Sequence, residues 1–182
     1  MDTGLRFRAV GVALAAVVLG GGVLAGSQSA FSASTATAMD TPPSIVEDYT
    51  YPGAAQILAQ YNVKLISGDG GILFADCATP PTGDIGLIQV HTTERIGPNG
   101  QGVLCFRVAK PSGHLEMEVP GVYEIHGDGQ RAGTGHKTTA IVRTDAGQLP
   151  PVTVNPSGST QVGIGADPNN PPTTLLQLTV TP

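Results

Sequence analysis

Glycine and proline divide this chain into short segments, and this feature limits the possible folds more than any other. The sequence has 25 glycines and 15 prolines, about twice their average share. Four Pro-Pro pairs lie at 42–43, 80–81, 150–151 and 171–172. Because proline has no backbone N–H to donate to a sheet ladder, these pairs mark connections between strands. The composition therefore disfavours a helical bundle or coiled coil, while the Val, Ile and Leu content disfavours a fully disordered chain.

The first 38 residues have the layout of a secretory signal peptide. Arg6 and Arg8 precede an apolar run over 10–25, and small residues then lead to an A-x-A site at 36–38. The run is shorter than the ~20 residues of a membrane-spanning helix, so we expect cleavage and no stable membrane anchor afterwards. An uncleaved N-terminal anchor and an earlier cleavage at the small residues of 23–25 stay open as alternatives. The sequence thus predicts a secreted, extracellular protein.

Three parts are predicted along the chain: a signal peptide over 1–38, a flexible lead over 39–48 and a single domain over 49–182. A short helix is expected over 52–61, with Pro52 in its first turn and Asn62 at its end. Strand candidates follow at short spacing without alternating helices, which predicts an all-β fold, an antiparallel β-sandwich of Greek-key or jelly-roll type. These candidates cover 63–66, 72–77, 85–92, 103–108, 114–119, 122–126, 138–143, 152–154, 161–164 and 175–180.

Two turn signals make specific predictions about strand pairing. The sequence Ser-Gly-Asp-Gly-Gly over 67–71 has hairpin chemistry, because glycine tolerates positive φ, and predicts that the strands on either side form a hairpin. Alternation of apolar and polar residues over 114–119 predicts a strand with one face in water, which Pro120 is expected to end or kink.

Cys77 and Cys105 are the only cysteines. An even number in an exported chain predicts a disulfide, with a metal pair or a nucleophilic thiol as the alternatives. In the predicted strand Cys105 shares a face with Arg107, which indicates a less deeply buried face. We therefore expect the bridge near a sheet margin or between neighbouring strands, and not through the middle of the sandwich.

No motif for catalysis, metal binding or cofactor binding is recognised. Asp69 and Asp128 resemble a carboxylate pair, but each lies between glycines, where aspartate is favoured for local backbone hydrogen bonds. His126 and His136 flank the same turn as Asp128 without the spacing of a zinc or calcium site. The sequence predicts no catalytic, metal or cofactor residues, and an enzyme is the less favoured class. The net charge of −5 also argues against nucleic acid as a partner.

A partner-binding surface is the remaining hypothesis for a site. The chain has four tyrosines and no tryptophan, and its ten-residue loop over 93–102 contains a Gly-Pro-Asn-Gly turn. Aromatic rings can stack on sugars or anchor a protein partner, although tyrosines also seal helices onto sheets. The residues predicted for this surface are Tyr49, Tyr51, Tyr123, Pro98 and Asn99.

The segments over 47–54, 68–70, 75–77 and 174–178 resemble small secreted β-rich proteins of actinobacteria. The resemblance covers most of residues 45 to 180. It implies export and a shared fold, and it implies no activity and no catalytic residues.

Three functions follow from the sequence. The favoured one is a secreted binding or structural module at the cell envelope or in the medium, with an extracellular protein or glycan as its partner. The loop over 93–102, beside a strand that carries a cysteine, supports an inhibitor of secreted proteases as an alternative. A hydrolase with a cryptic carboxylate site is the second alternative.

Overall fold

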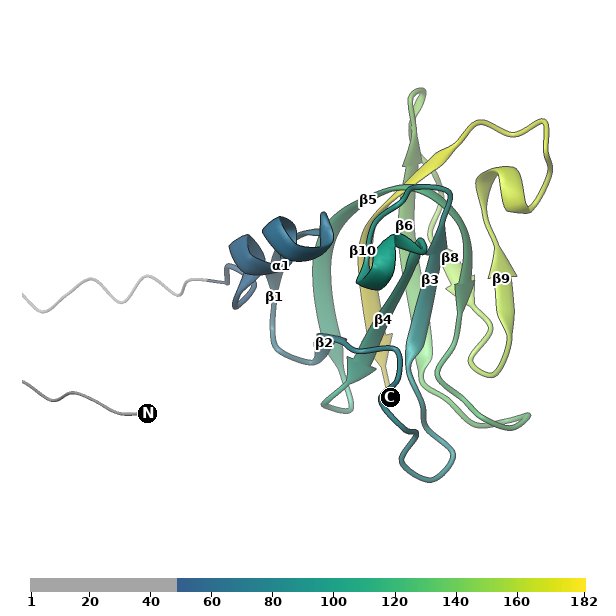
Figure 1. The fold of residues 1–182 in the computed structure, drawn as a ribbon. Helices are drawn as coiled ribbons and strands as arrows, with labels where there is room; N and C mark the ends of the chain where they lie inside the picture. The colour runs from purple at the N-terminus through teal and green to yellow at the C-terminus, as the bar shows by residue number, and fades with distance from the viewer. Residues whose placement is uncertain (1–48) are drawn as a thin grey trace, which may run out of the picture. The chain divides into compact units, whose positions relative to one another are not determined.

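The computed structural model describes residues 49–182 (Figure 1). The predicted signal peptide and lead lie outside the described residues. The described chain consists mostly of antiparallel strands with one short α-helix, α1 (Ala54–Tyr61), which confirms the predicted β-rich class and the helix near its start. Backbone pairing joins all ten described strands into a single open sheet, so two stacked sheets are not confirmed. Among residues 49–182, no helix has the length and apolar character needed to cross a bilayer.

The strand order in the sheet is β2-β4-β3-β5-β10-β6-β7, with β1 and β9 paired to β5 and β8 paired to β6. Most predicted strands are present, but β7 was not predicted, and the candidate over 161–164 contains only the last residue of β9 and the first two residues of η2. The elements after α1 are β1 (Lys64–Gly68), β2 (Ile72–Ala75), β3 (Ile88–Thr92), η1 (Pro98–Gly100), β4 (Val103–Val108), β5 (Gly113–His126), β6 (Lys137–Thr144), β7 (Gly147–Gln148), β8 (Val152–Val154), β9 (Ser159–Gln161), η2 (Gly163–Gly165) and β10 (Thr173–Thr181).

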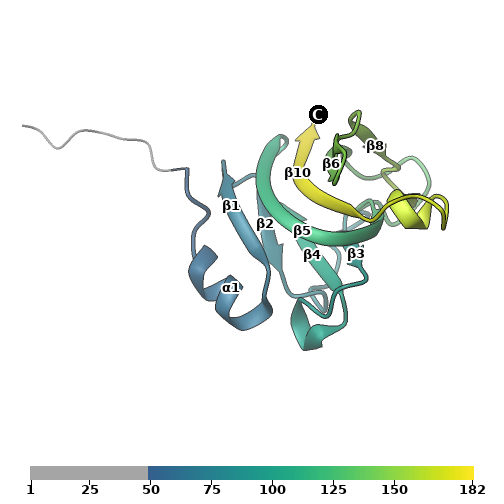
Figure 2. The same ribbon diagram turned by 90° about the horizontal axis from the view of Figure 1, so that it is seen from above.

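The long strand β5 organises the sheet. Pro120 does not end this strand, which continues to His126, and the next residue, Gly121, has φ 66°. The first part of β5 pairs with β1 and β10, and its last residues pair with β3 and β9. Figure 2 shows that β5 and β10 curve together. Of the two outcomes predicted for Pro120, an end to the strand is wrong, because β5 continues past this residue and pairs with two sets of neighbours.

The residues between β1 and β2 form a corner, so the predicted hairpin over 67–71 is wrong. β1 pairs with β5 and β2 pairs with β4, which means that the chain changes partners at this corner. The corner crosses the connection from β4 to β5 closely: a Cβ at Gly71 would lie 2.4 Å from the carbonyl oxygen of Ser112, and one at Gly113 would lie 2.8 Å from the carbonyl carbon of Gly71. Glycine is required here for the close approach of two backbones and not for a tight hairpin.

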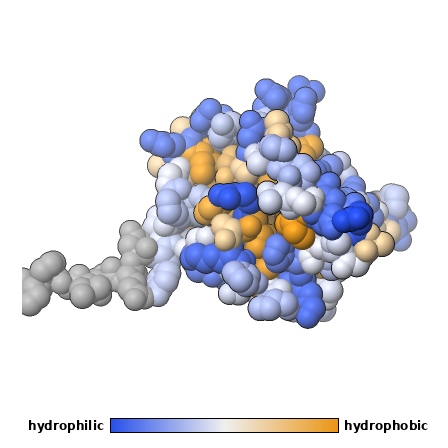
Figure 3. Space-filling model, turned by 90° about the horizontal axis from the view of Figure 1, so that it is seen from below, coloured by the Kyte–Doolittle hydropathy of each residue, from blue (hydrophilic) through white to orange (hydrophobic). Residues whose placement is uncertain are grey.

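One hydrophobic core lies under the bent sheet and extends to α1. Its fully buried side chains come from the alternating apolar positions of the strands, and Ile57 and Tyr61 of α1 are partly buried against it. Leu58 of the same helix is 45% exposed. On the face shown in Figure 3, hydrophobic side chains gather near the centre and are surrounded by hydrophilic ones. The largest fully buried side chains are Phe106, Ile72, Ile88, Leu104, Leu115, Met117, Ile125, Leu175 and Leu178.

Cys77 and Cys105 form a disulfide, with their Cα atoms 5.2 Å apart. Cys77 follows β2, the first strand of the sheet order, and Cys105 lies on its neighbour β4. The bridge therefore joins neighbouring strands at a sheet margin, as predicted. The reasoning from Arg107 was wrong, because Arg107 is exposed whereas Cys105 is fully buried. Cys77 itself is exposed.

Candidate functional site

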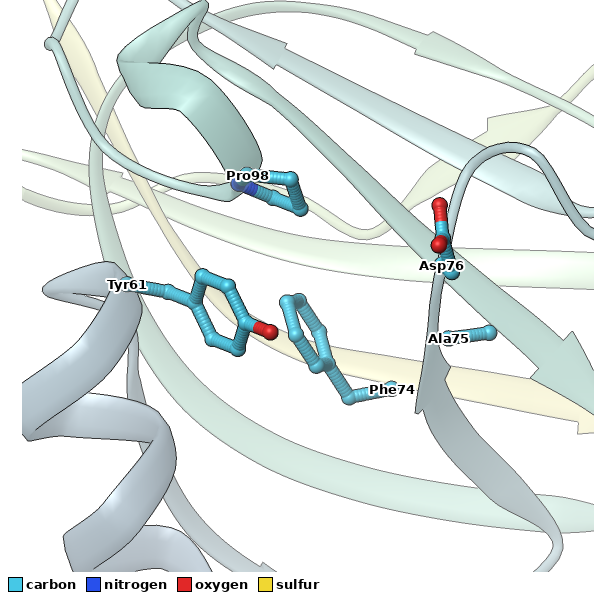
Figure 4. Close-up of a pocket in the computed structure, with 5 residues that line it drawn as sticks. All are labelled: Tyr61, Phe74, Ala75, Asp76 and Pro98. Carbon is cyan, nitrogen blue, oxygen red and sulfur yellow. The ribbon is translucent and has the colours of Figure 1, made fainter. Parts of the chain in front are cut away.

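An aromatic cleft lies where α1, β2 and η1 meet (Figure 4). Its volume is about 250 Å³, and Tyr61, Phe74, Ala75, Asp76 and Pro98 line it. Figure 4 shows the rings of Tyr61 and Phe74 side by side, with Pro98 on the other side of the opening. We call this site the aromatic cleft.

Packing and hydrogen bonds fix the walls of the aromatic cleft. The ring centroids of Tyr61 and Phe74 are 5.5 Å apart, and Phe74 meets the buried ring of Phe106 edge-on at 5.7 Å. The backbone N–H of Gly97 donates to the carbonyl oxygen of Tyr61 at 2.8 Å and ties the turn that carries Pro98 to the end of the helix. Since both aromatic walls rest on the core, the cleft is largely preformed.

Asp76 supplies the carboxylate of the aromatic cleft. Its Oδ1 accepts a hydrogen bond from the N–H of Ala78 at 2.9 Å, and the next residue, Cys77, is held by the disulfide. The side chain is exposed, and the ion pairs formed among residues 49–182 do not include it. The aromatic cleft therefore combines apolar ring faces with an oriented negative charge at its rim.

One of the residues predicted for partner binding lies at the aromatic cleft, and a second is its neighbour in the chain. Pro98 lines it, and Asn99 follows directly, exposed and with φ 60°. Phe74 and Asp76 were missed, although an aromatic residue two positions before a carboxylate next to a cysteine was visible in the sequence. The missing information was which strand would lie at the margin of the sheet.

Tyr51 does not belong to the predicted surface, because it is only 5% exposed. Its Oη accepts a hydrogen bond from the backbone N–H of Phe74 at 2.7 Å. Burial raises the pKa of this hydroxyl, and the hydrogen bond from Phe74 opposes the rise only in part. Tyr51 thus ties the segment before α1 to the free edge of β2, which supports the alternative that tyrosines seal the helix onto the sheet.

The other two tyrosines of the predicted surface lie elsewhere. Tyr49 is 59% exposed, and its carbonyl oxygen accepts a hydrogen bond from Gly68 at the end of β1. Tyr123 lies on β5 against His91 of β3, with their ring centroids 6.1 Å apart. Neither lines the aromatic cleft, so Pro98 is the one residue of the five-residue surface that lines this site.

Asp69 binds backbone groups, as its position between glycines predicted. Its Oδ1 accepts hydrogen bonds from the N–H groups of Gly71 at 2.8 Å and His114 at 3.0 Å. Burial acts to raise the pKa of Asp69, but these hydrogen bonds and the nearby charge of Lys110 outweigh it, so the pKa is lowered. Asp69 fixes the corner between β1 and β2.

Asp128 is fully buried and fixes a second loop. It accepts hydrogen bonds from the backbone N–H of His136 at 2.8 Å and pairs with the Nδ1 of the same residue at 2.6 Å. His126 contacts its neighbour Gly127 through Nδ1. Within residues 49–182, no three His, Cys, Asp or Glu side chains are grouped in a way that could hold a metal ion.

Compared with known proteins, the chain matches no protein-family model and no curated protein at a significant level.

Proposed function

We propose that this protein is exported and acts as a binding module for an extracellular protein at the cell envelope or in the medium. The signal-peptide layout of the first 38 residues supports export, as does a disulfide, which persists in oxidising compartments. The resemblance to small secreted actinobacterial proteins points in the same direction.

The scaffold that we propose for this role is a β-sandwich made from one bent sheet. The curve of β5 and the corner at Gly71 each carry the chain from one set of strand partners to another. Bends of this kind are how strands pass from one layer to the other in orthogonal sandwiches.

The aromatic cleft is the observation that carries the proposal. Binding sites are typically preformed and apolar, with a few placed polar groups, and aromatic side chains anchor protein interfaces. The aromatic cleft has these properties, and the disulfide holds the strand beside it. At about 250 Å³ it is smaller than most small-molecule sites, so one side chain of a larger partner fits it better than a drug-sized ligand.

Both alternatives have less support. For a protease inhibitor, the loop over 93–102 has the required rigidity, because hydrogen bonds fix it. A protease must, however, reach the residues on both sides of the bond that it cleaves. Arg95 is exposed, but the next residue, Ile96, is only 5% exposed. The carboxylate pair of a glycoside hydrolase must face one substrate, whereas Asp69 and Asp128 each bind the backbone of their own loop.

Filling the aromatic cleft tests the proposal. Ala75→Leu adds side-chain volume to the cleft wall, and Ala132→Leu makes the same change at an exposed turn. The two variants and the unmodified protein are immobilised and exposed to culture fluid and envelope extract, and the captured proteins are compared by mass spectrometry. We expect a protein that the unmodified chain and Ala132→Leu retain and Ala75→Leu loses. Equal capture by all three would contradict the proposal, provided that Ala75→Leu keeps the unfolding midpoint of the unmodified chain.

A further inference from the structure

We infer that the aromatic cleft recognises a basic side chain, arginine above lysine, on the protein partner. This inference rests on the function proposed above and assigns the chemistry of the ligand.

The charge of the aromatic cleft is complementary to a cation. Asp76 is exposed at the rim, is oriented by the N–H of Ala78, and belongs to none of the ion pairs within residues 49–182. The chain as a whole has fourteen acidic and nine basic residues. A net negative field attracts cationic partners over distance, and the local carboxylate gives the final pairing.

The aromatic walls suit the rest of such a side chain. Tyr61 and Phe74 offer ring faces against which the aliphatic stem of arginine or lysine packs, and cations bind favourably over aromatic faces. Arginine is favoured because its planar guanidinium stacks on rings and is less strongly hydrated than an ammonium group.

The edge of β2 limits how the partner reaches the aromatic cleft. The backbone N–H of Phe74 is already bound by the Oη of Tyr51. A partner that added a strand along this edge would need such N–H groups free. The partner therefore inserts a side chain into the cleft and does not extend the sheet here.

Four small probes test the inference by ¹H–¹⁵N NMR titration of the purified protein: the N-acetyl methylamides of arginine, lysine, citrulline and norleucine. We expect arginine to shift the amides of residues 74–77 at the lowest concentration, followed by lysine, with the neutral probes weaker. Asp76→Asn should weaken arginine binding about three- to fivefold, as loss of an exposed ion pair does, and leave citrulline binding unchanged. Asp145→Asn removes an exposed carboxylate on the turn after β6 and should change neither.

The outcomes separate this inference from the proposed function. If norleucine and citrulline bind the aromatic cleft as well as arginine does, the cleft is a binding site and the inferred charge recognition is wrong. If no probe shifts residues 74–77 at 50 mM, the inference is overturned, and the capture experiment with Ala75→Leu still decides whether the cleft binds a partner. Arginine binding that is equal in Asp76→Asn and the unmodified protein also overturns it.

Discussion

Removing the disulfide is the perturbation with the best-defined magnitude. The bridge closes a loop whose ends are 28 residues apart, and restricting this loop in the unfolded chain gives about 3.5 kcal/mol of stability at 25 °C. This is a large share of the 5–15 kcal/mol by which domains are usually stable. We therefore expect Cys77→Ser combined with Cys105→Ala to lower the free energy of unfolding by about 3–4 kcal/mol. Alanine is chosen at 105 because that position is fully buried.

Urea unfolding followed by tyrosine fluorescence and circular dichroism measures this change, since the chain has no tryptophan. With a slope of about 2 kcal/mol per molar urea, the midpoint should fall by somewhat less than 2 M. The unmodified protein, reduced and kept in reductant, is the matched control because it has the same side chains without the bond. A loss below 1 kcal/mol in both samples would refute the argument that the bridge restricts the unfolded chain.

Three further predictions concern the loops and corners. His136→Ala should lower the free energy of unfolding by about 3 kcal/mol, because it leaves the fully buried carboxylate of Asp128 without its ring partner. In a double-mutant cycle, removing both side chains should lower this free energy by less than the sum of the two single changes. The pKa of Asp69 is lower in the folded protein than in the unfolded chain, so its ionised form stabilises the fold at neutral pH. This stabilisation begins to be lost when the pH falls to about 4, where the unfolded chain takes up the proton, and it is lost fully below the lowered pKa of the folded protein. Between pH 7 and pH 3, Asp69→Asn should therefore lose less stability than the unmodified protein in urea titrations. Gly71→Ala should lower the free energy of unfolding by about 2–3 kcal/mol, because its Cβ would lie 2.4 Å from a backbone oxygen. Gly133→Ala should lower it by less, because φ is positive there but a Cβ would meet nothing within 4 Å.

Local signals in the sequence were reliable for single elements. Asn62 ends α1 in the left-handed conformation, as its position after the predicted helix indicated. The predicted strands over 103–108 and 152–154 match β4 and β8. These elements depend on side-chain alternation and turn residues, which are properties of neighbouring positions.

Pairing between distant strands was not predictable in the same way. Glycine-rich residues over 67–71 fit a hairpin as well as a corner, and only the pairing of β1 with β5 and β2 with β4 distinguishes them. The burial of Cys105 was also not predictable from its neighbours, because Cys105 is bridged to a residue 28 positions away and is fully buried, whereas Arg107 on the same face is exposed.

The candidate site shows the same limit. The sequence identified Pro98 because a Pro-Asn-Gly turn in a long loop is visible without a structure. It did not identify Phe74 or Asp76, whose importance comes from the position of β2 at the sheet margin and its packing against α1. It also could not place Tyr51 inside, because the hydrogen bond from Phe74 joins residues 23 positions apart.

Site-specific photo-crosslinking tests most directly whether partners bind at the aromatic cleft. A benzophenone side chain is introduced at Gln101, which follows η1 and is exposed, and in a separate sample at Gln148, which is exposed on β7 at the other end of the sheet order. After irradiation in culture fluid and envelope extract, we predict a specific adduct from position 101 that an excess of the unmodified protein suppresses, and no such adduct from position 148. Adducts formed equally from both positions, or only from 148, would contradict the placement of the binding site at the aromatic cleft.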